Sequence, residues 1–145
     1  MKKVIGFMSV VSLLFLLTAC GAKAELKQVD AEGAVSVLDS KNGFLFYIYD
    51  HDGFEDYKVH LKNSVDKTDT TVNYFIDKDM NATGKDQVRD RDEKNAFEKR
   101  IKNTQVETLY IHAIKNGEVI DKLRVDDYFE GELSKELTDF INRNK

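Results

Sequence analysis

One run of six apolar and aromatic residues, Phe44–Tyr49, does most to limit the folds open to this chain. A strand without polar alternation is typical of a sheet that is covered on both faces. A second β-rich run extends over Thr71–Ile76. Between the two runs, apolar residues recur at helical spacing from Phe54 to Leu61, which predicts a helix ending near Ser64. Because a helix that joins two strands of one sheet makes a crossover, these strands are expected to be parallel.

The C-terminal half predicts an antiparallel hairpin. Asn116-Gly117 supplies the positive φ angles of a tight turn, between strands expected over Val106–Ile114 and Val119–Val125. Asp30 is a candidate N-cap for an early helix. Apolar spacing predicts three further helices, around Ala34–Leu38, Ala96–Ile101 and Leu133–Ile141. This order predicts the α/β class, with a mixed four-stranded sheet flanked by helices.

The N-terminus reads as a secretory leader. Lys2 and Lys3 precede the apolar stretch Val4–Leu17, which is too short for a confident membrane span. The tetrad that follows, Leu17-Thr18-Ala19-Cys20, resembles the lipobox of bacterial lipoproteins. The resemblance implies that Cys20 is joined to diacylglycerol and becomes the first residue of the mature chain. The alternative is an ordinary signal peptide followed by a chance cysteine.

This interpretation divides the chain into a lipoprotein signal peptide (1–19), a lipidated tether (20–27) and one domain (28–145). The domain is expected on the extracytoplasmic face of the cell membrane, held by its acylated cysteine. Cys20 is the only cysteine, so no disulfide can form within the chain. Lipidation would consume a thiol that is otherwise a liability in an exported protein.

The charge balance argues against one class of partner. The chain has 22 basic and 26 acidic residues, and two of the basic ones, Lys2 and Lys3, belong to the leader. Nucleic-acid binding depends on clustered Lys and Arg, so no nucleic-acid partner is expected. The chain contains no proline, which excludes a proline-rich stalk.

Local sequence also resembles the thioredoxin family over about residues 28–143. Phe44–Tyr49, the turn at 50–53 and the helix from Phe54 are similar to the family's first strand and active-site helix. Thr108-Leu109-Tyr110-Ile111 followed by Lys115-Asn116-Gly117-Glu118-Val119 is similar to its hairpin, and Leu133–Ile141 to its closing helix. Within the family, the chain most resembles small Gram-positive members, including bacteriocin-associated accessory proteins. The resemblance implies a thioredoxin-like fold.

Two departures from the family argue against its redox activity. The Cys-x-x-Cys motif would fall at Gly53-Phe54-Glu55-Asp56, where there is no cysteine, and disulfide exchange requires a thiolate. The family's cis-proline corresponds to Glu107, which is expected in a trans peptide because a non-proline cis bond costs about 2.5–4 kcal/mol. We therefore expect a redox-silent domain with no catalytic residues and no cofactor.

Charged and histidine residues cluster around the positions where the family's redox motif would fall. They are Asp50, His51, Asp52, Glu55, Asp56 and His60. Carboxylates near a helix N-terminus are explained by capping and by the helix dipole. The alternative is a metal site with His51 and His60 as nitrogen ligands, although the spacing matches no standard zinc pattern.

Other candidate motifs are weaker. In the polar stretch 77–93, Asp77, Asp79 and Asn81 resemble the start of a calcium loop, but Ala82 and Val88 replace the Gly and Glu that such a loop needs. His112 lies in the middle of a predicted strand and is expected to have a local hydrogen-bond partner. No nucleophile–base pair is visible in the sequence around the serines Ser36, Ser40, Ser64 and Ser134.

Tyr128 and Phe129 lie in an acidic segment before the last helix. They would contact a partner if exposed, or cap the last helix if buried. The sequence therefore predicts a non-enzymatic module that binds an envelope protein or peptide. One alternative is a thiol-less accessory to an extracytoplasmic thiol–disulfide oxidoreductase. Another is a signalling role for fragments of the leader, such as 12–19.

Overall fold

The computed structural model describes residues 23–77, 87–102 and 104–145. The strands are β1 (Leu26–Gln28), β2 (Asn42–Ile48), β3 (Val72–Ile76), β4 (Tyr110–Lys115) and β5 (Glu118–Arg124). The α-helices are α1 (Ala31–Leu38), α2 (His51–Thr68), α3 (Gln87–Ile101) and α4 (Glu130–Asn144). A short 3-10 helix, η3 (Val125–Asp127), lies between β5 and α4.

The strands form one mixed sheet in the order β1-β3-β2-β4-β5. β2 pairs in parallel with β3, and β3 with β1, whereas β4 is antiparallel to both β2 and β5. The α2 crossover and the hairpin turn impose this arrangement. At the turn, Asn116 has φ 52° and Gly117 φ 80°, as a two-residue hairpin loop requires. The predicted α/β class is confirmed.

The sheet has five strands rather than the predicted four, because Leu26–Gln28 forms an edge strand. Leu26 and Lys27, assigned to the tether from sequence, therefore belong to the sheet. Hydrogen bonds hold this segment from both ends: Val72 N–H donates to Glu25 O at 3.1 Å, and Val29 N–H to Tyr74 O at 2.9 Å. A three-residue strand with one apolar side chain has no period by which it could be recognised.

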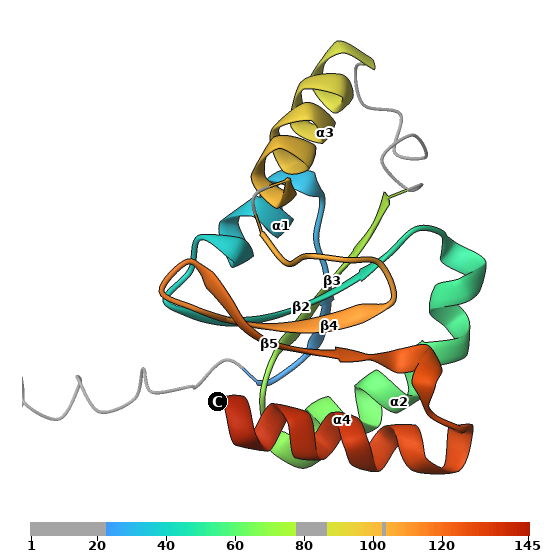
Figure 1. The fold of residues 1–145 in the computed structure, drawn as a ribbon. Helices are drawn as coiled ribbons and strands as arrows, with labels where there is room; N and C mark the ends of the chain where they lie inside the picture. Colours follow the sequence, from blue (N-terminus) through green and yellow to red (C-terminus); the bar gives the residue numbers. More distant parts are fainter. Residues whose placement is uncertain (1–22, 78–86, 103) are drawn as a thin grey trace, which may run out of the picture.

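Two helical layers cover the two faces of the sheet, α1 and α3 on one face and α2 and α4 on the other (Figure 1). Alternate residues of β2 supply both cores. Phe44, Phe46 and Ile48 pack with α2 and α4. Leu45 and Tyr47 pack with α1 and α3. The interpretation of this run as a strand covered on both faces is thus confirmed.

Several element boundaries differ from the prediction: α2 ends at Thr68 rather than near Ser64, and α3 begins at Gln87 rather than near Ala96. α2 begins at His51 rather than Phe54, because Asp50 is its N-cap and its Oδ1 accepts the Gly53 N–H at 2.9 Å. β4 begins at Tyr110 rather than Val106, since Leu109 has φ 66° and interrupts the extended backbone. Among the described residues, no helix is both long and apolar enough to cross a membrane. The leader, Cys20, Asp79 and Asn81 lie outside the described residues.

The packing of α4 on the sheet can be tested with two phenylalanines, one within the helix and one just before it. Phe140 is fully buried, with its ring edge-on to Phe44 at 6.2 Å, whereas Phe129 is 84% exposed. Phe140→Ala is expected to lower the free energy of unfolding by about 3–5 kcal/mol, because it removes a buried ring and leaves a cavity. Phe129→Ala, the matched control, should change it by less than about 0.5 kcal/mol. Urea denaturation followed by circular dichroism measures both, and similar losses for the two variants would contradict the placement.

Candidate functional site

The candidate site lies where β2 ends and α2 begins. The segment before β4 is fixed beside this corner, because Leu109 N–H donates to Tyr47 O at 2.8 Å. On its other side, Leu109 O accepts the Val125 N–H at 2.9 Å. The three segments enclose an open hollow of about 220 Å³. Its lining residues are Ile48, Tyr49, Asp50, Gly53, Thr108 and Leu109.

The four positions that correspond to the redox motif have different surroundings. Gly53 lines the hollow, and a Cβ there would lie 3.2 Å from the capping Oδ1 of Asp50. Phe54 is 1% exposed and stacks on Tyr74 with ring centroids 4.1 Å apart. Glu55 is exposed and paired with Lys58 at 2.9 Å, and Asp56 is exposed. Gly53 thus belongs to the N-cap of α2, Phe54 to the core, and Glu55 and Asp56 to the exposed surface of the helix.

Glu107 lies in the wall of the corner and precedes the hollow-lining Thr108. The described peptide bonds are all trans, including that of Glu107. Its backbone N–H donates to His112 Nε2 at 3.0 Å, and its carboxylate pairs with Lys122. The hydrogen bond from Lys122 lowers the pKa of the Glu107 carboxyl. The Glu107 side chain is thus paired with a residue of β5.

The next two residues form the part of the wall that a ligand can reach. Leu109 adopts φ 66°, a left-handed conformation that is costly for a side chain of its size. Thr108 is exposed, and its backbone N–H and C=O bond to no other described residue. The corner therefore presents the unpaired backbone N–H and C=O of Thr108 beside the hollow.

His112 supports this wall from beneath. The ring is fully buried, its Nδ1 lies 3.0 Å from Leu45 O, and its Nε2 accepts the Glu107 N–H. The ring is therefore neutral, with its proton on Nδ1. Burial, together with the nearby charge of Lys122, lowers the pKa of His112 to about 4. The expectation of a hydrogen-bonded strand histidine is confirmed, and its role is to position the wall.

The two histidines of the possible metal site point to different partners. His51 Nδ1 lies 3.9 Å from Glu55 Oε1 on the surface of α2. His60 Nδ1 instead lies 2.8 Å from Ser134 Oγ, on α4. In the parts of the chain that the structure describes, no three His, Cys, Asp or Glu side chains are grouped as a metal site would require.

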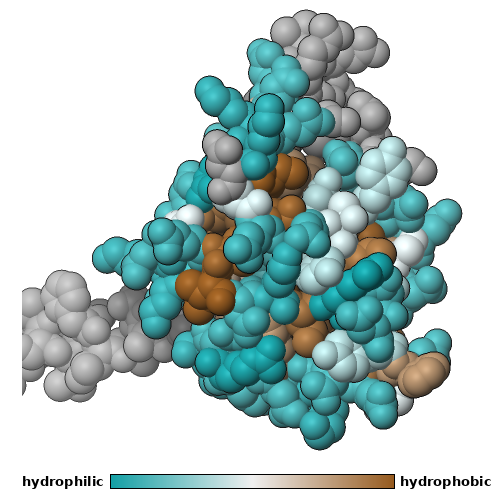
Figure 2. Space-filling model, viewed as in Figure 1, coloured by the Kyte–Doolittle hydropathy of each residue, from teal (hydrophilic) through white to brown (hydrophobic). Residues whose placement is uncertain are grey.

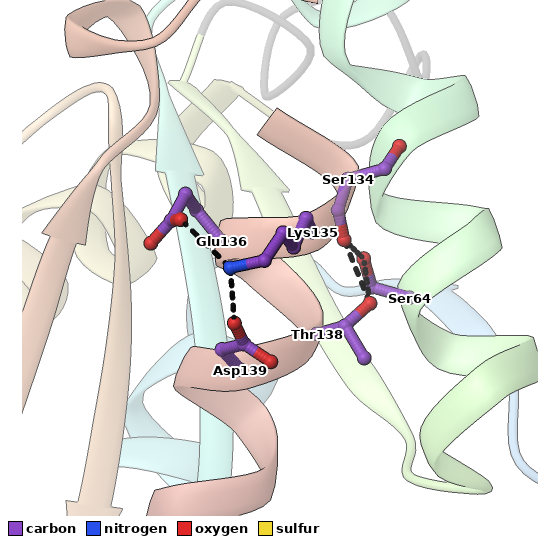
Figure 3. Close-up of polar contacts among 6 residues, drawn as sticks. All are labelled: Ser64, Ser134, Lys135, Glu136, Thr138 and Asp139. Carbon is purple, nitrogen blue, oxygen red and sulfur yellow. Dashed lines mark hydrogen bonds and ion pairs between the residues drawn. The ribbon is translucent and has the colours of Figure 1, made fainter. Parts of the chain in front are cut away.

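A polar seam joins α2 to α4 and was not visible in the sequence, because its partners are 70 or more residues apart. We call His60, Ser64, Ser134 and Thr138 the α2–α4 seam. The Ser64 hydroxyl is fully buried, and its one proton is shared between His60 O at 2.9 Å and Ser134 O at 3.1 Å. Thr138 Oγ1 lies 3.3 Å from Ser64 Oγ and 2.7 Å from Ser134 O (Figure 3).

The seam brings a histidine and a serine together, as a nucleophile and base would be, but it lacks the other parts of a catalytic site. A serine nucleophile needs a base that a third group orients. No described carboxylate pairs with His60. The carboxylates of Glu136 and Asp139 both pair with Lys135 on the same helix, α4 (Figure 3). The seam is therefore a contact between two helices.

The structure describes part of the possible calcium loop and both residues of the aromatic pair before α4. Asp77, the first residue of the possible calcium loop, accepts a hydrogen bond from the Tyr47 hydroxyl at 3.3 Å. Burial raises the pKa of that hydroxyl. Tyr128 is half-buried and packs on the core beneath α4. Phe129 is exposed, and its carbonyl accepts the N–H groups of Glu132 and Leu133 at the start of α4.

Large exposed apolar side chains are scattered over the described surface. They are Tyr49 after β2, Val59 on α2, Ile120 on β5 and Phe129 before α4. In the view of Figure 2, apolar areas are likewise broken up by hydrophilic residues. Among the exposed side chains of this group, Tyr49 is the one that also lines the hollow.

Comparison with known proteins finds no matching family model, no matching curated protein and no matching solved structure.

The buried imidazole predicts a specific loss of stability in acid. The unfolded-state pKa of about 6.5 exceeds the folded value of about 4, so the contribution of His112 is complete above pH 6.5 and is lost as the pH falls toward 4. Between about pH 7 and pH 4.5 this loss should reach about 2–3 kcal/mol. His112→Gln should lose stability at neutral pH but lack this part of the acid dependence.

Urea denaturation at both pH values measures the effect. His51→Gln is the control, since that ring is exposed, and it should follow the unmodified chain. A constant difference between His112→Gln and the unmodified chain at the two pH values would show that His112 does not titrate as described.

Proposed function

We propose that this chain is a lipid-anchored, non-enzymatic thioredoxin-like module that binds an extended segment of an envelope protein at the β2–α2 corner. The observation that carries the proposal is the hollow, with the unpaired backbone N–H and C=O of Thr108 and the exposed ring of Tyr49 at its edge. The anchor is the lipobox-like cysteine, Cys20.

The arrangement of elements supports the thioredoxin-like part of the proposal. A parallel β2-α2-β3 crossover, an antiparallel β4–β5 hairpin and a closing helix α4 follow one another as in the family that the sequence resembles. The family-like residues of the hairpin, Tyr110–Lys115 and the Asn116-Gly117 turn, form the strand and turn expected of them. The strand β1 is an addition at the edge of this arrangement.

The size and chemistry of the corner favour a peptide over a small molecule. Pockets for small ligands enclose about 300–1,000 Å³, more than the space at the corner. An extended peptide gains main-chain hydrogen bonds from unpaired backbone groups, and a pocket takes one of its side chains. Thr108 offers such groups, and the neighbouring hollow is of a size for one side chain.

The chemistry of the corner also favours binding without turnover. The only thiol of the chain is Cys20, which the proposal assigns to the lipid anchor. Three polar side chains near the hollow already have structural partners: Asp50 caps α2, Glu107 pairs with Lys122, and His112 bonds the backbone.

Peptide binding can be tested with two exposed apolar side chains. Tyr49 is 55% exposed at the hollow, and Ile120 is 48% exposed on β5. Random peptides displayed on phage are selected against the full chain, and the affinity of a selected peptide is measured by titration calorimetry. Tyr49→Ala should weaken binding about tenfold or more, the loss of roughly 1.4 kcal/mol or more expected of an aromatic anchor. Ile120→Ala should leave the affinity unchanged.

The contrary outcomes of that titration are equally clear. Equal losses in the two variants would place the binding surface elsewhere. Failure to select any peptide that binds the full chain would count against the proposed function as a whole.

Redox silence has its own test. The full chain should reduce insulin disulfides with dithiothreitol no faster than dithiothreitol alone, because no thiol lies at Gly53–Asp56 to attack a disulfide. The turbidity of the released insulin chain is recorded against time. A rate clearly above that of the reductant alone would contradict the proposal.

A further inference from the structure

The chain enters the fold at one end of the sheet, and this entry is fixed. Glu25 N–H donates to Thr71 Oγ1 at 3.3 Å, and Glu25 O accepts the Val72 N–H at 3.1 Å. One residue earlier, Ala24 already packs against the core beneath α2 and α4. The polypeptide is therefore part of the folded body from Ala24 onward.

The same end of the molecule carries the last turn of α2 and the last residue of the sequence. Lys145 Nζ donates to Thr68 O at 3.2 Å, and Thr68 is followed at once by the turn into β3. We call Ala24–Glu25, Lys67–Thr71 and Lys145 the entry pole. Figure 1 shows the incoming chain and the C-terminus close together, with the β2–α2 corner on the opposite side of the molecule.

The register of the sheet fixes how far the hollow lies from the entry pole. Val72, bonded to Glu25, and Ile76 are separated by the length of β3, roughly 13 Å at about 3.3 Å per residue. Ile76 pairs with Ile48, which lines the hollow. Tyr49 and Asp50 continue beyond that pair. The hollow and the entry pole are therefore at opposite ends of β3.

The covalent tether is short compared with the domain. Cys20 and Ala24 are four residues apart, which allows at most about 14 Å in a fully extended chain. A domain of this length has a radius of gyration of roughly 14 Å, so it is about 35 Å across. A domain held by so short a tether cannot turn its far end toward the membrane.

We infer that the domain meets the lipid headgroups with its entry pole and holds the hollow on the side that faces away from the membrane. This inference rests on the proposed lipid anchor at Cys20. It narrows the partner to a protein segment that approaches from outside the bilayer. Segments embedded in the same membrane are excluded, because they cannot reach the far end of the domain.

The two ends of α2 provide a matched pair of probes. Asp52 lies in its first turn, beside the hollow, and Lys67 in its last turn, at the entry pole, and both are exposed. Fifteen helical residues separate them by about 22 Å. With Cys20 acylated, Asp52→Cys or Lys67→Cys introduces the only free thiol. The full chain is expressed in bacteria, and isolated membranes are treated with a maleimide attached to a large polyethylene glycol.

In these membranes Lys67→Cys should react several-fold more slowly than Asp52→Cys. A Gly/Ser insertion of about 20 residues between Ala22 and Lys23 gives a linker of roughly 25 Å and frees the domain to rotate. In that background the two rates should become similar. Equal rates with the natural tether, or slower reaction of Asp52→Cys, would overturn the inferred orientation.

The anchor itself is checked in the same experiment, so the two failures can be told apart. The parent chain should be found in the membrane fraction and should not react, since lipid occupies its thiol. Reaction of the parent chain, or its absence from the membrane fraction, would overturn the proposed anchor and the inference that rests on it.

Discussion

The central strand β2 is enclosed on every side, and the other elements are arranged around it. β3 and β4 pair with its two edges, and helices cover both of its faces. Five consecutive residues, Phe44–Ile48, are buried as a result. A strand in this position can leave the core only at its ends, and the C-terminal end opens directly onto the hollow.

The polar side chains at that end stabilise the shape of the corner. Asp50 is used by the helix it caps, and His112 by the backbone of the wall. These are permanent structural bonds, and they hold Thr108 and Leu109 beside the end of β2. The corner can contact a ligand through the backbone groups of Thr108, the ring of Tyr49 and the small hollow between them. Recognition through such groups depends on shape and main-chain pairing more than on charge.

Sequence patterns predicted the parts of the fold that depend on local chemistry. The Phe44–Tyr49 run, the Asn116-Gly117 turn and the Asp30 cap each specify a conformation through their own residues. Each is found, except that the strand ends at Ile48 and leaves Tyr49 exposed. β1 escaped prediction because its conformation comes from β3, which lies more than 40 residues away in the sequence. The turn between β2 and α2 was predicted at 50–53, and α2 begins there, at His51. The conformation of the wall was not predicted, since the positive φ of Leu109 follows from tertiary hydrogen bonds.

The α2–α4 seam escaped prediction for a related reason. His60 and Ser134 carry no motif, and only the packing of two helices with parallel directions makes them neighbours. A hydroxyl that is buried between helices can be recognised only once its partners are known.

The position of β1 also has a mechanical consequence for a chain held at its N-terminus. It pairs with β3 along its length, and further hydrogen bonds at Glu25 and Val29 extend this pairing beyond both ends. A pull transmitted through the preceding residues acts along the strand axis, so these bonds are loaded in shear and share the force. With the anchor proposed at Cys20, the three residues of β1 would therefore bear a pull from the membrane before it reached the buried core.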